Sequence, residues 1–312
     1  MNHIDAAQNH SVDILKKLRE LLKTEDNTFA IVVGGSVARL EASPESDLDY
    51  FFFGDDDDAI KRAKEHLQKY AESIKSIVGK EPSVTGAFGS ENGETLDALN
   101  ANIGGNDDAN GKITRRILFL LEGAWLSSEK TVERYRREVL KRYISTAITD
   151  PQLCRFLLND IIRYYRTICV DFEFKTVEGG KEWGLRYIKL RYSRQLLYFS
   201  GLIAVAETVN MSRDEKIERL AALMQLPPIQ RIREVVGEQN VAPALKLYNE
   251  FLGGISNGVS RAEINEVTQD RNTHTEIFKK LREDGRVFSQ LLAEILQNKY
   301  DANHLIHRAI IF

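Results

Sequence analysis

Residues 31–36 read IVVGGS, and residues 46–53 read SDLDYFFF. Each stretch contains a short run of β-branched or aromatic residues, which predicts a buried strand, and the two glycines after the first run predict a tight turn. Asp47 and Asp49 stand at the start of the second predicted strand. Because successive side chains of a strand point to opposite faces, these two carboxylates are expected to project from the same face.

Asp47 and Asp49 are therefore candidate metal ligands. Two neighbouring carboxylates repel each other, and their ionised pair is costly unless a cation lies between them. Mg²⁺ suits hard oxygen ligands and typically takes one or two protein carboxylates, with water and substrate phosphates completing its shell. We expect both aspartates to hold Mg²⁺, with Mn²⁺ as the alternative ion, and to be the catalytic residues.

The turn of Gly34, Gly35 and Ser36 is a candidate phosphate site. Glycines carry no side chain, so their backbone N–H groups can approach phosphate oxygens closely, and the Ser36 hydroxyl adds a donor. A metal clamp beside a phosphate cradle predicts a site for a nucleoside triphosphate.

The pattern resembles the signature of the DNA polymerase β-like nucleotidyltransferase superfamily, in which a strand and a Gly-Gly/Ser turn precede an Asp-x-Asp on the next strand. The longer run GGSVARLEASPESDLD at residues 34–49 is most similar to the branch that contains the PII-protein uridylyltransferases and related nucleotidyltransferases. The resemblance extends over residues 29–53. It implies a small catalytic sheet paired with a helical module.

The bulk composition is that of a water-soluble globular protein. The 312 residues are enough for one large or two ordinary domains. The net charge of −3 and the pI near 6.1 argue against a dedicated nucleic-acid-binding surface. The chain has no apolar run long enough to span a membrane and no secretory leader at its N-terminus, so we expect a cytoplasmic protein without membrane contact. Cys154 and Cys169 are expected to be free thiols, and the six histidines lack the spacing of a zinc site.

The predicted fold class is α+β, with a small mixed-sheet nucleotidyltransferase domain followed by an all-α helical domain. Residues 1–127 are assigned to the catalytic domain and residues 128–312 to the helical domain, since no strand pattern follows residue 111. Helices are predicted over residues 4–23, 59–78 and 112–125, among others. A short strand is expected near residues 84–85. Gly253 and Gly254 are expected to separate two helical segments.

Three further residues are candidates for contact with the triphosphate. Arg39 either faces the phosphates or lies on the outside of a short helix. Lys189 and Ser193 are four residues apart and share one helix face. In several branches of the superfamily a Lys and a Ser of the helical module touch the triphosphate, and the run LRYIKL at residues 185–190 is similar to that element. The alternative for Lys189 is an exposed lysine on a basic helix.

The superfamily also implies a third carboxylate on a later strand, which helps to deprotonate the acceptor. The sequence leaves its identity open among several acids. These are Glu81, Glu91, Asp97, Asp107 and Asp108.

Two other polar stretches have a structural and a functional interpretation. The turn-rich run at residues 102–111 is either a surface loop or a substrate loop. The charged strip on the helix predicted after Pro151 forms either ion pairs between helices or a face that binds the acceptor. The strip comprises Asn159, Asp160, Arg163, Arg166, Asp171, Glu173 and Lys175.

These features predict a Mg²⁺-dependent nucleotidyltransferase that moves a nucleoside monophosphate from a nucleoside triphosphate to a protein or small-molecule acceptor, with release of pyrophosphate. Two alternatives stay open. One is a synthase of oligo- or cyclic nucleotides, and the other is a catalytically inactive nucleotide-binding regulatory protein, motivated by the unplaced third carboxylate.

Overall fold

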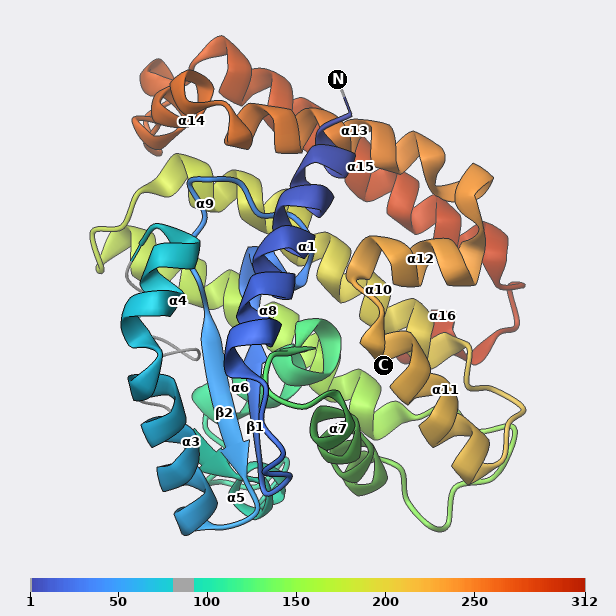
Figure 1. Cartoon of the computed structure of the whole chain (residues 1–312). Coiled ribbons are helices and arrows are strands. Elements are labelled where there is room, and N and C mark those ends of the chain that lie inside the picture. The colour runs from blue at the N-terminus through green and yellow to red at the C-terminus, as the bar shows by residue number, and fades with distance from the viewer. Residues whose placement is uncertain (1, 81–92, 312) are drawn as a thin grey trace.

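A small four-stranded sheet lies at the centre of the N-terminal part of the computed structural model, which describes residues 2–80 and 93–311 (Figure 1). The strand order is β3-β2-β1-β4. The strands are β1 (Phe29–Val33), β2 (Tyr50–Gly54), β3 (Gly93–Thr95) and β4 (Ala124–Trp125). β2 and β4 run antiparallel to β1, and β3 runs parallel to β2. The predicted α+β class with a small mixed sheet is confirmed.

Every residue of β1 and β2 is buried, which is why both strands are apolar along their whole length. Their side chains alternate between two apolar clusters. Ala30, Val32, Phe51 and Phe53 belong to the larger cluster, which continues into the C-terminal helices, whereas Ile31, Val33, Tyr50 and Phe52 pack with residues of α1, α3 and α4. Asp49 directly precedes β2, and the charge of Arg194 from the C-terminal part of the chain acts on its carboxylate.

The described residues of the N-terminal part form six helices: α1 (His3–Leu22), α2 (Gly35–Ala38), α3 (Asp57–Lys69), α4 (Ala71–Val78), α5 (Leu96–Asn100) and α6 (Asn110–Glu122). Asp56 caps the N-terminus of α3, because its carboxylate accepts a hydrogen bond from the Ala59 N–H at 2.8 Å. The single helix predicted over residues 59–78 is wrong. The chain breaks at Tyr70, whose φ of −110° and ψ of 10° leave the helical region.

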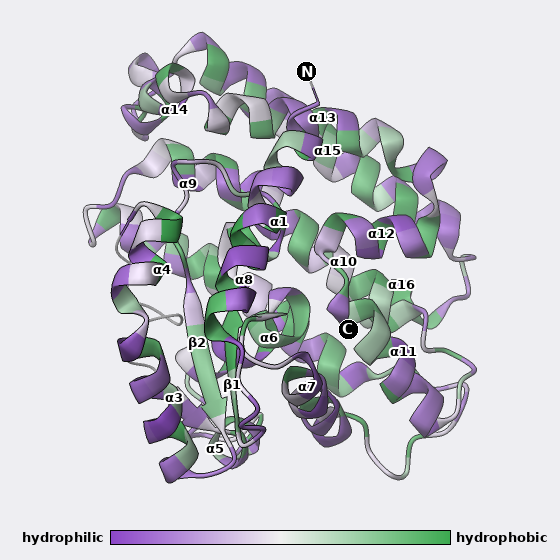
Figure 2. Cartoon of the chain, in the orientation of Figure 1, coloured by the Kyte–Doolittle hydropathy of each residue, from purple (hydrophilic) through white to green (hydrophobic). Residues whose placement is uncertain are grey.

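The rest of the chain is helical. Its helices are α7 (Glu129–Tyr143), α8 (Arg155–Val177), α9 (Trp183–Lys189), α10 (Gln195–Ala206), α11 (Arg213–Gln225), α12 (Pro228–Val236), α13 (Glu238–Ser256), α14 (Gly258–Asn265), α15 (Glu276–Lys299) and α16 (Leu305–Ala309). A π-helical turn, Leu190–Arg194, joins α9 to α10, and a 3₁₀ turn, Arg271–Thr273, precedes α15. Figure 2 shows α10 as mainly hydrophobic, in keeping with its burial, and α3 and α7 with hydrophilic outer sides.

The predicted break at Gly253 and Gly254 is wrong, since α13 continues to Ser256. The glycines serve close packing of helices instead. A Cβ atom on Gly253 would lie 2.8 Å from the His3 ring, and one on Gly254 would lie 3.1 Å from Leu281. The absence of a strand after residue 111 is also wrong, because Ala124–Trp125 pairs with β1. That strand has only two residues, which is too short for an alternating pattern.

The first helix ties the N-terminus to the helical part. The backbone N–H groups of His3 and Ile4 donate to the Asn249 side chain of α13 at 2.7 and 3.1 Å. The division at residues 127 and 128 stays a prediction. Within the described residues, no helix combines the length and apolar character that a membrane span requires. The strand expected near residues 84–85 lies outside the described residues.

Candidate active site

Asp49 and the glycine turn are in direct contact. Asp49 directly precedes β2, and its carbonyl accepts a hydrogen bond from the Gly34 N–H at 2.8 Å. The next residue, Gly35, has a φ of +66°, and a Cβ atom there would lie 2.5 Å from the Asp49 Oδ2. Only glycine satisfies both the left-handed backbone and the close approach of the carboxylate. The predicted metal half and phosphate half of the site are therefore neighbours.

The two predicted metal ligands have different surroundings. The Asp47 side chain is 70% exposed, and the Lys80 Nζ lies 3.9 Å from its Oδ1. Asp49 is half-buried and makes no ion pair with any described residue. Burial raises the pKa of Asp49; the charges of Glu122 and Asp47 also raise it, while Arg194 and Arg39 oppose the shift.

This donor set fits Mg²⁺ bound together with a nucleotide. Two carboxylates are available, and among the described residues no group of three His, Cys, Asp or Glu side chains could hold a metal ion. An ion that keeps several waters and takes substrate phosphates needs no more than one or two carboxylates. The pair does not fit a closed, structural metal site.

Of the acids that the sequence left open as the third carboxylate, none in the described part of the chain joins this pair. Asp97 and Asp107 are exposed. Asp97 lies just after β3, beyond Thr95, which pairs with Gly54 at the end of β2 remote from Asp49. Glu81 and Glu91 lie outside the described residues.

Asp108 is committed to a structural network instead. Its side chain is buried, accepts from the Arg116 Nη2 at 2.9 Å and from the Gly104 N–H at 2.9 Å, and has the Arg163 Nη1 at 3.3 Å. Burial would raise the pKa of Asp108, but the hydrogen bonds from Arg116 and Gly104 hold that pKa below its usual range. The ion-pair interpretation of this part of the charged strip therefore has direct structural support.

Glu122, a residue that sequence reasoning missed, lies behind the glycine turn. It ends α6, its side chain is fully buried, and its Oε1 accepts from the Gly35 N–H at 2.9 Å. Its Oε2 accepts from the Arg39 Nη1 at 2.6 Å, and the Arg194 Nη1 lies 3.7 Å away. The available signal was a carboxylate directly after the apolar run of residues 117–121.

These bonds change the expected phosphate cradle. The amides of Gly34 and Gly35 already donate to Asp49 and Glu122. The Ser36 amide and hydroxyl, by contrast, donate to no described residue, and Ser36 is half-buried beside the acids. Ser36 is thus the member of the turn whose donors are open to a phosphate.

Arg39 does not face an open site. It is 6% exposed and bonds two carboxylates, Glu122 and, at 3.0 Å, Glu41. Glu41 also accepts from the hydroxyl of Tyr248, which lies 3.2 Å from the Ser193 Oγ. A buried chain of polar contacts therefore connects the glycine turn to α13 and to the π-helical turn, and Arg39 and Ser193 both belong to it.

Lys189 lies across from the acids. The pKa of Lys189 is lowered to about 8, first by burial and then by the charges of Arg261, Arg39 and Arg194, while Asp47 opposes the shift. Arg194 follows in the π-helical turn, and Arg261 is on α14. π-helical turns inside α-helices are frequent at functional sites. The structure thus brings Lys189 to the site and adds Arg194 and Arg261, which sequence reasoning missed.

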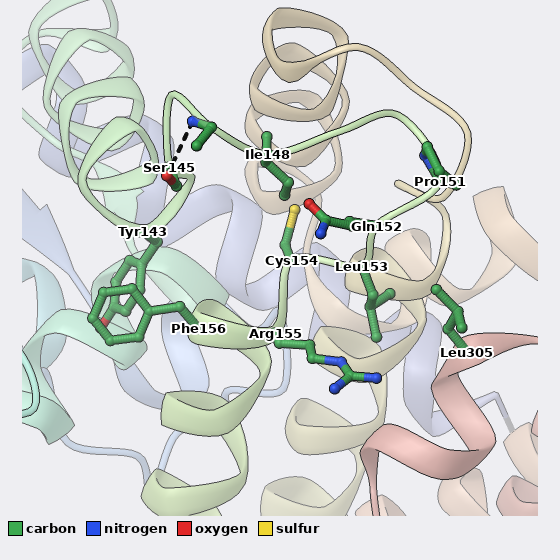
Figure 3. A pocket seen from close by; sticks show the side chains of 11 residues that line it. Tyr143, Ser145, Ile148, Pro151, Gln152, Leu153, Cys154, Arg155, Phe156 and Leu305 are labelled. Carbon is green, nitrogen blue, oxygen red and sulfur yellow. Dashed lines mark hydrogen bonds between the residues drawn. The ribbon is translucent and has the colours of Figure 1, made fainter.

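A separate pocket lies between the loop after α7, the start of α8 and Leu305 (Figure 3). Its volume is about 590 Å³, and none of the predicted site residues lines it. Cys154 is part of its lining, and burial raises the pKa of that thiol. A protonated thiol is a poor nucleophile, so Cys154 is not a candidate nucleophile in this pocket.

The comparison with known families agrees with the geometry. Residues 15–90 match a family model described as "Nucleotidyltransferase domain". The match contains the glycine turn and both aspartates, and it supports the DNA polymerase β-like superfamily, whereas the uridylyltransferase-like branch stays a prediction. No curated protein is similar enough to the chain to count as a match. Residues 15–90 therefore carry a nucleotidyltransferase domain, and the protein is a transferase of phosphorus-containing groups.

Proposed function

We propose that this protein is a Mg²⁺-dependent nucleotidyltransferase that moves a nucleoside monophosphate from a nucleoside triphosphate to a protein or small-molecule acceptor and releases pyrophosphate. One observation carries the proposal. Asp49 lies against Gly35 without an ion pair from any described residue, beside Asp47 and facing a set of basic side chains. Acids on one side and cations on the other match a metal-bound triphosphate.

The residues have separate tasks in this proposal. Asp47 and Asp49 would hold Mg²⁺, or Mn²⁺ in its place, and the ion would neutralise negative charge on the phosphates. Ser36 donates to phosphate oxygens. Lys189 supplies a positive charge from the helical side, with Arg194 near it.

Arg39 and Glu122 act behind the site. Glu122 holds the Gly35 amide, and Arg39 holds Glu122, so the turn keeps its shape when the triphosphate arrives. Such preorganisation lets fixed donors act on the developing charge without rearranging. Ser193 contributes through Tyr248 to the same framework.

In the transfer, an acceptor hydroxyl attacks the α-phosphorus and releases its proton to solvent. A new oxygen–phosphorus bond forms on one side while the bond to the bridging oxygen of pyrophosphate breaks on the other. Positioning and charge stabilisation supply most of the rate gain in such reactions, because the protein forms no covalent intermediate.

The test is incubation with each α-labelled nucleoside triphosphate, Mg²⁺ and cell extract, with pyrophosphate and labelled product as readouts. The wild type is compared with the double variant Asp47→Ala/Asp49→Ala. The matched control is Asp57→Ala/Asp58→Ala, which removes two exposed acids at the start of α3. We expect product with the wild type and the control only; equal product from all three proteins would refute the assignment.

A further inference from the structure

The second half of α8 exposes an apolar stripe. Val170, Phe174 and Val177 are 71%, 57% and 64% exposed. They are spaced four and three residues apart, so they lie on one side of the helix. A contiguous apolar surface of this kind marks an interaction site more often than a random exposed residue does. We name these three residues the α8 stripe.

The α8 stripe borders a groove. Val170 and Phe174 line a hollow of about 730 Å³, whose other wall is the first turn of α6 with Asn110, Gly111 and Thr114. A Cβ atom on Gly111 would have no atom within 4 Å, so that wall is open. The groove unites two stretches that the catalytic site does not use, the end of the turn-rich loop and the charged strip.

The charges around the groove favour an acidic occupant. Arg163, Arg166 and Lys175 line it, against one carboxylate, Asp171. Lys175 pairs with Asp171 at 2.6 Å, and Arg163 pairs with the buried Asp108 at 3.3 Å. Arg166 is exposed and makes no ion pair with any described residue.

The combination of an apolar stripe with a few basic side chains favours a protein over a nucleic acid as the occupant of the groove. Nucleic-acid surfaces depend on many cations that neutralise phosphates, whereas here exposed apolar side chains dominate and the chain carries a net charge of −3. A segment with acidic side chains near Arg166 and apolar side chains along the stripe would match both features.

The groove also lies close to the catalytic residues along the same helix. Tyr164 of α8 is buried close to Arg194, Glu122 and Arg39, whose charges act on its hydroxyl group. Phe174 follows ten residues later, which is about 15 Å along an α-helix. About five residues of extended chain span that distance.

We propose that the groove between α6 and the α8 stripe docks a protein acceptor through an acidic segment with apolar side chains. This inference rests on the proposed nucleotidyl transfer and names the acceptor class. The docked segment holds the acceptor near α8, and a neighbouring part of it reaches the site.

Photo-crosslinking tests the docking without relying on activity. p-Benzoylphenylalanine replaces Phe174 in the full chain, and cell extract is irradiated with it. The control carries the same group at Val287, which is 44% exposed within the long helix α15. We expect a cross-link at position 174 that maps by mass spectrometry to an acidic, apolar segment of another protein. A cross-link to nucleic acid, a cross-link to a second copy of this chain, or none above the control would overturn the proposal.

Surface variants then connect docking to transfer. Val170→Asp/Phe174→Asp and Gly111→Glu each introduce negative charge where the fold has room, and Val287→Asp is the control. We expect both groove variants to lower labelling of protein in extract at least tenfold, while nucleotide affinity and circular dichroism stay as in the wild type. Unchanged labelling would refute docking at this groove. A wild type that labels nothing with any nucleotide would refute the proposed transfer, and the cross-link would still decide the docking.

Discussion

Two pairs of aspartates in this molecule have opposite surroundings. Asp108 and Asp160 share one guanidinium, because the Arg116 Nη2 lies 2.9 Å from the first and 3.1 Å from the second. The side chains of Arg116 and Asp108 are fully buried, and that of Asp160 is 6% exposed. Asp47 and Asp49 share no arginine, and one of them is 70% exposed.

The comparison shows where this fold leaves charge for a ligand. Two nearby carboxylates need a counter-charge, and the protein supplies its own for Asp108 and Asp160. Asp47 has only Lys80, whose Nζ lies 3.9 Å away, and Asp49 has no ion-pair partner among the described residues, so this pair is left largely free for a ligand cation. The first pair should therefore matter for stability and the second for chemistry, and the following four experiments test that division.

Asp108→Asn should give the largest effect, a loss of about 3–5 kcal/mol in the free energy of unfolding, because it leaves Arg116 buried with an incomplete partner set. Urea unfolding followed by circular dichroism measures the loss. The exposed neighbour Asp107→Asn is the control and should change stability little. A loss below 1 kcal/mol for Asp108→Asn would mean that the buried network is not structural.

Asp49→Asn should lower transfer activity by about 10²–10³-fold, the range seen when one preorganised charge-stabilising group is removed. Stability should stay equal or rise, because the burial that raises the pKa of Asp49 disfavours its ionised form in the folded protein. Pyrophosphate release and thermal unfolding are measured on the same preparation. If this variant unfolded instead of losing only its activity, Asp49 would matter for stability as Asp108 does, and the proposed division between the two pairs would be wrong.

Gly35→Ala should cost about 1–2 kcal/mol of stability from its left-handed backbone. It should also lower activity, since the new Cβ would displace the Asp49 carboxylate. Gly180→Ala separates the two effects, because Gly180 has a φ of +60° with no atom within 4 Å of the added Cβ. If both variants lose stability alike and both keep activity, the contact between Gly35 and Asp49 has no catalytic role.

Nucleotide affinity should fall about fivefold as pH rises through about 8, which is equivalent to about 1 kcal/mol. Lys189 is protonated and cationic below its pKa of about 8 and neutral above it, so the attraction to phosphate is lost on the alkaline side. Bound triphosphate would raise the pH at which half of the Lys189 side chains are protonated, because its negative charge stabilises the cationic form. Fluorescence titrations from pH 6.5 to 9.5 measure the nucleotide affinity at each pH. Lys189→Met should remove the pH dependence of this affinity. The same pH dependence in the variant would mean that another group titrates.

Local sequence patterns predicted the catalytic strand–turn–strand. The apolar runs, the two glycines and the alternation that puts Asp49 on one face depend on neighbours within a few residues. The same holds for the long helical part. Such features follow from the covalent geometry of adjacent residues, so they can be predicted from the sequence.

Tertiary structure decided which residues complete the site. Glu122 bonds Gly35 across 87 positions of the chain, and Tyr248 reaches Glu41 across 207. No periodicity encodes such pairs, because they arise only when α6 packs on β2 and α13 packs against α1. Packing also reversed the reading of Gly253 and Gly254, whose missing side chains let α1 and α15 approach rather than break a helix. The sequence alone determined the acids and the turn. Folding selected their buried support, because only three-dimensional packing decides which charges the protein itself neutralises.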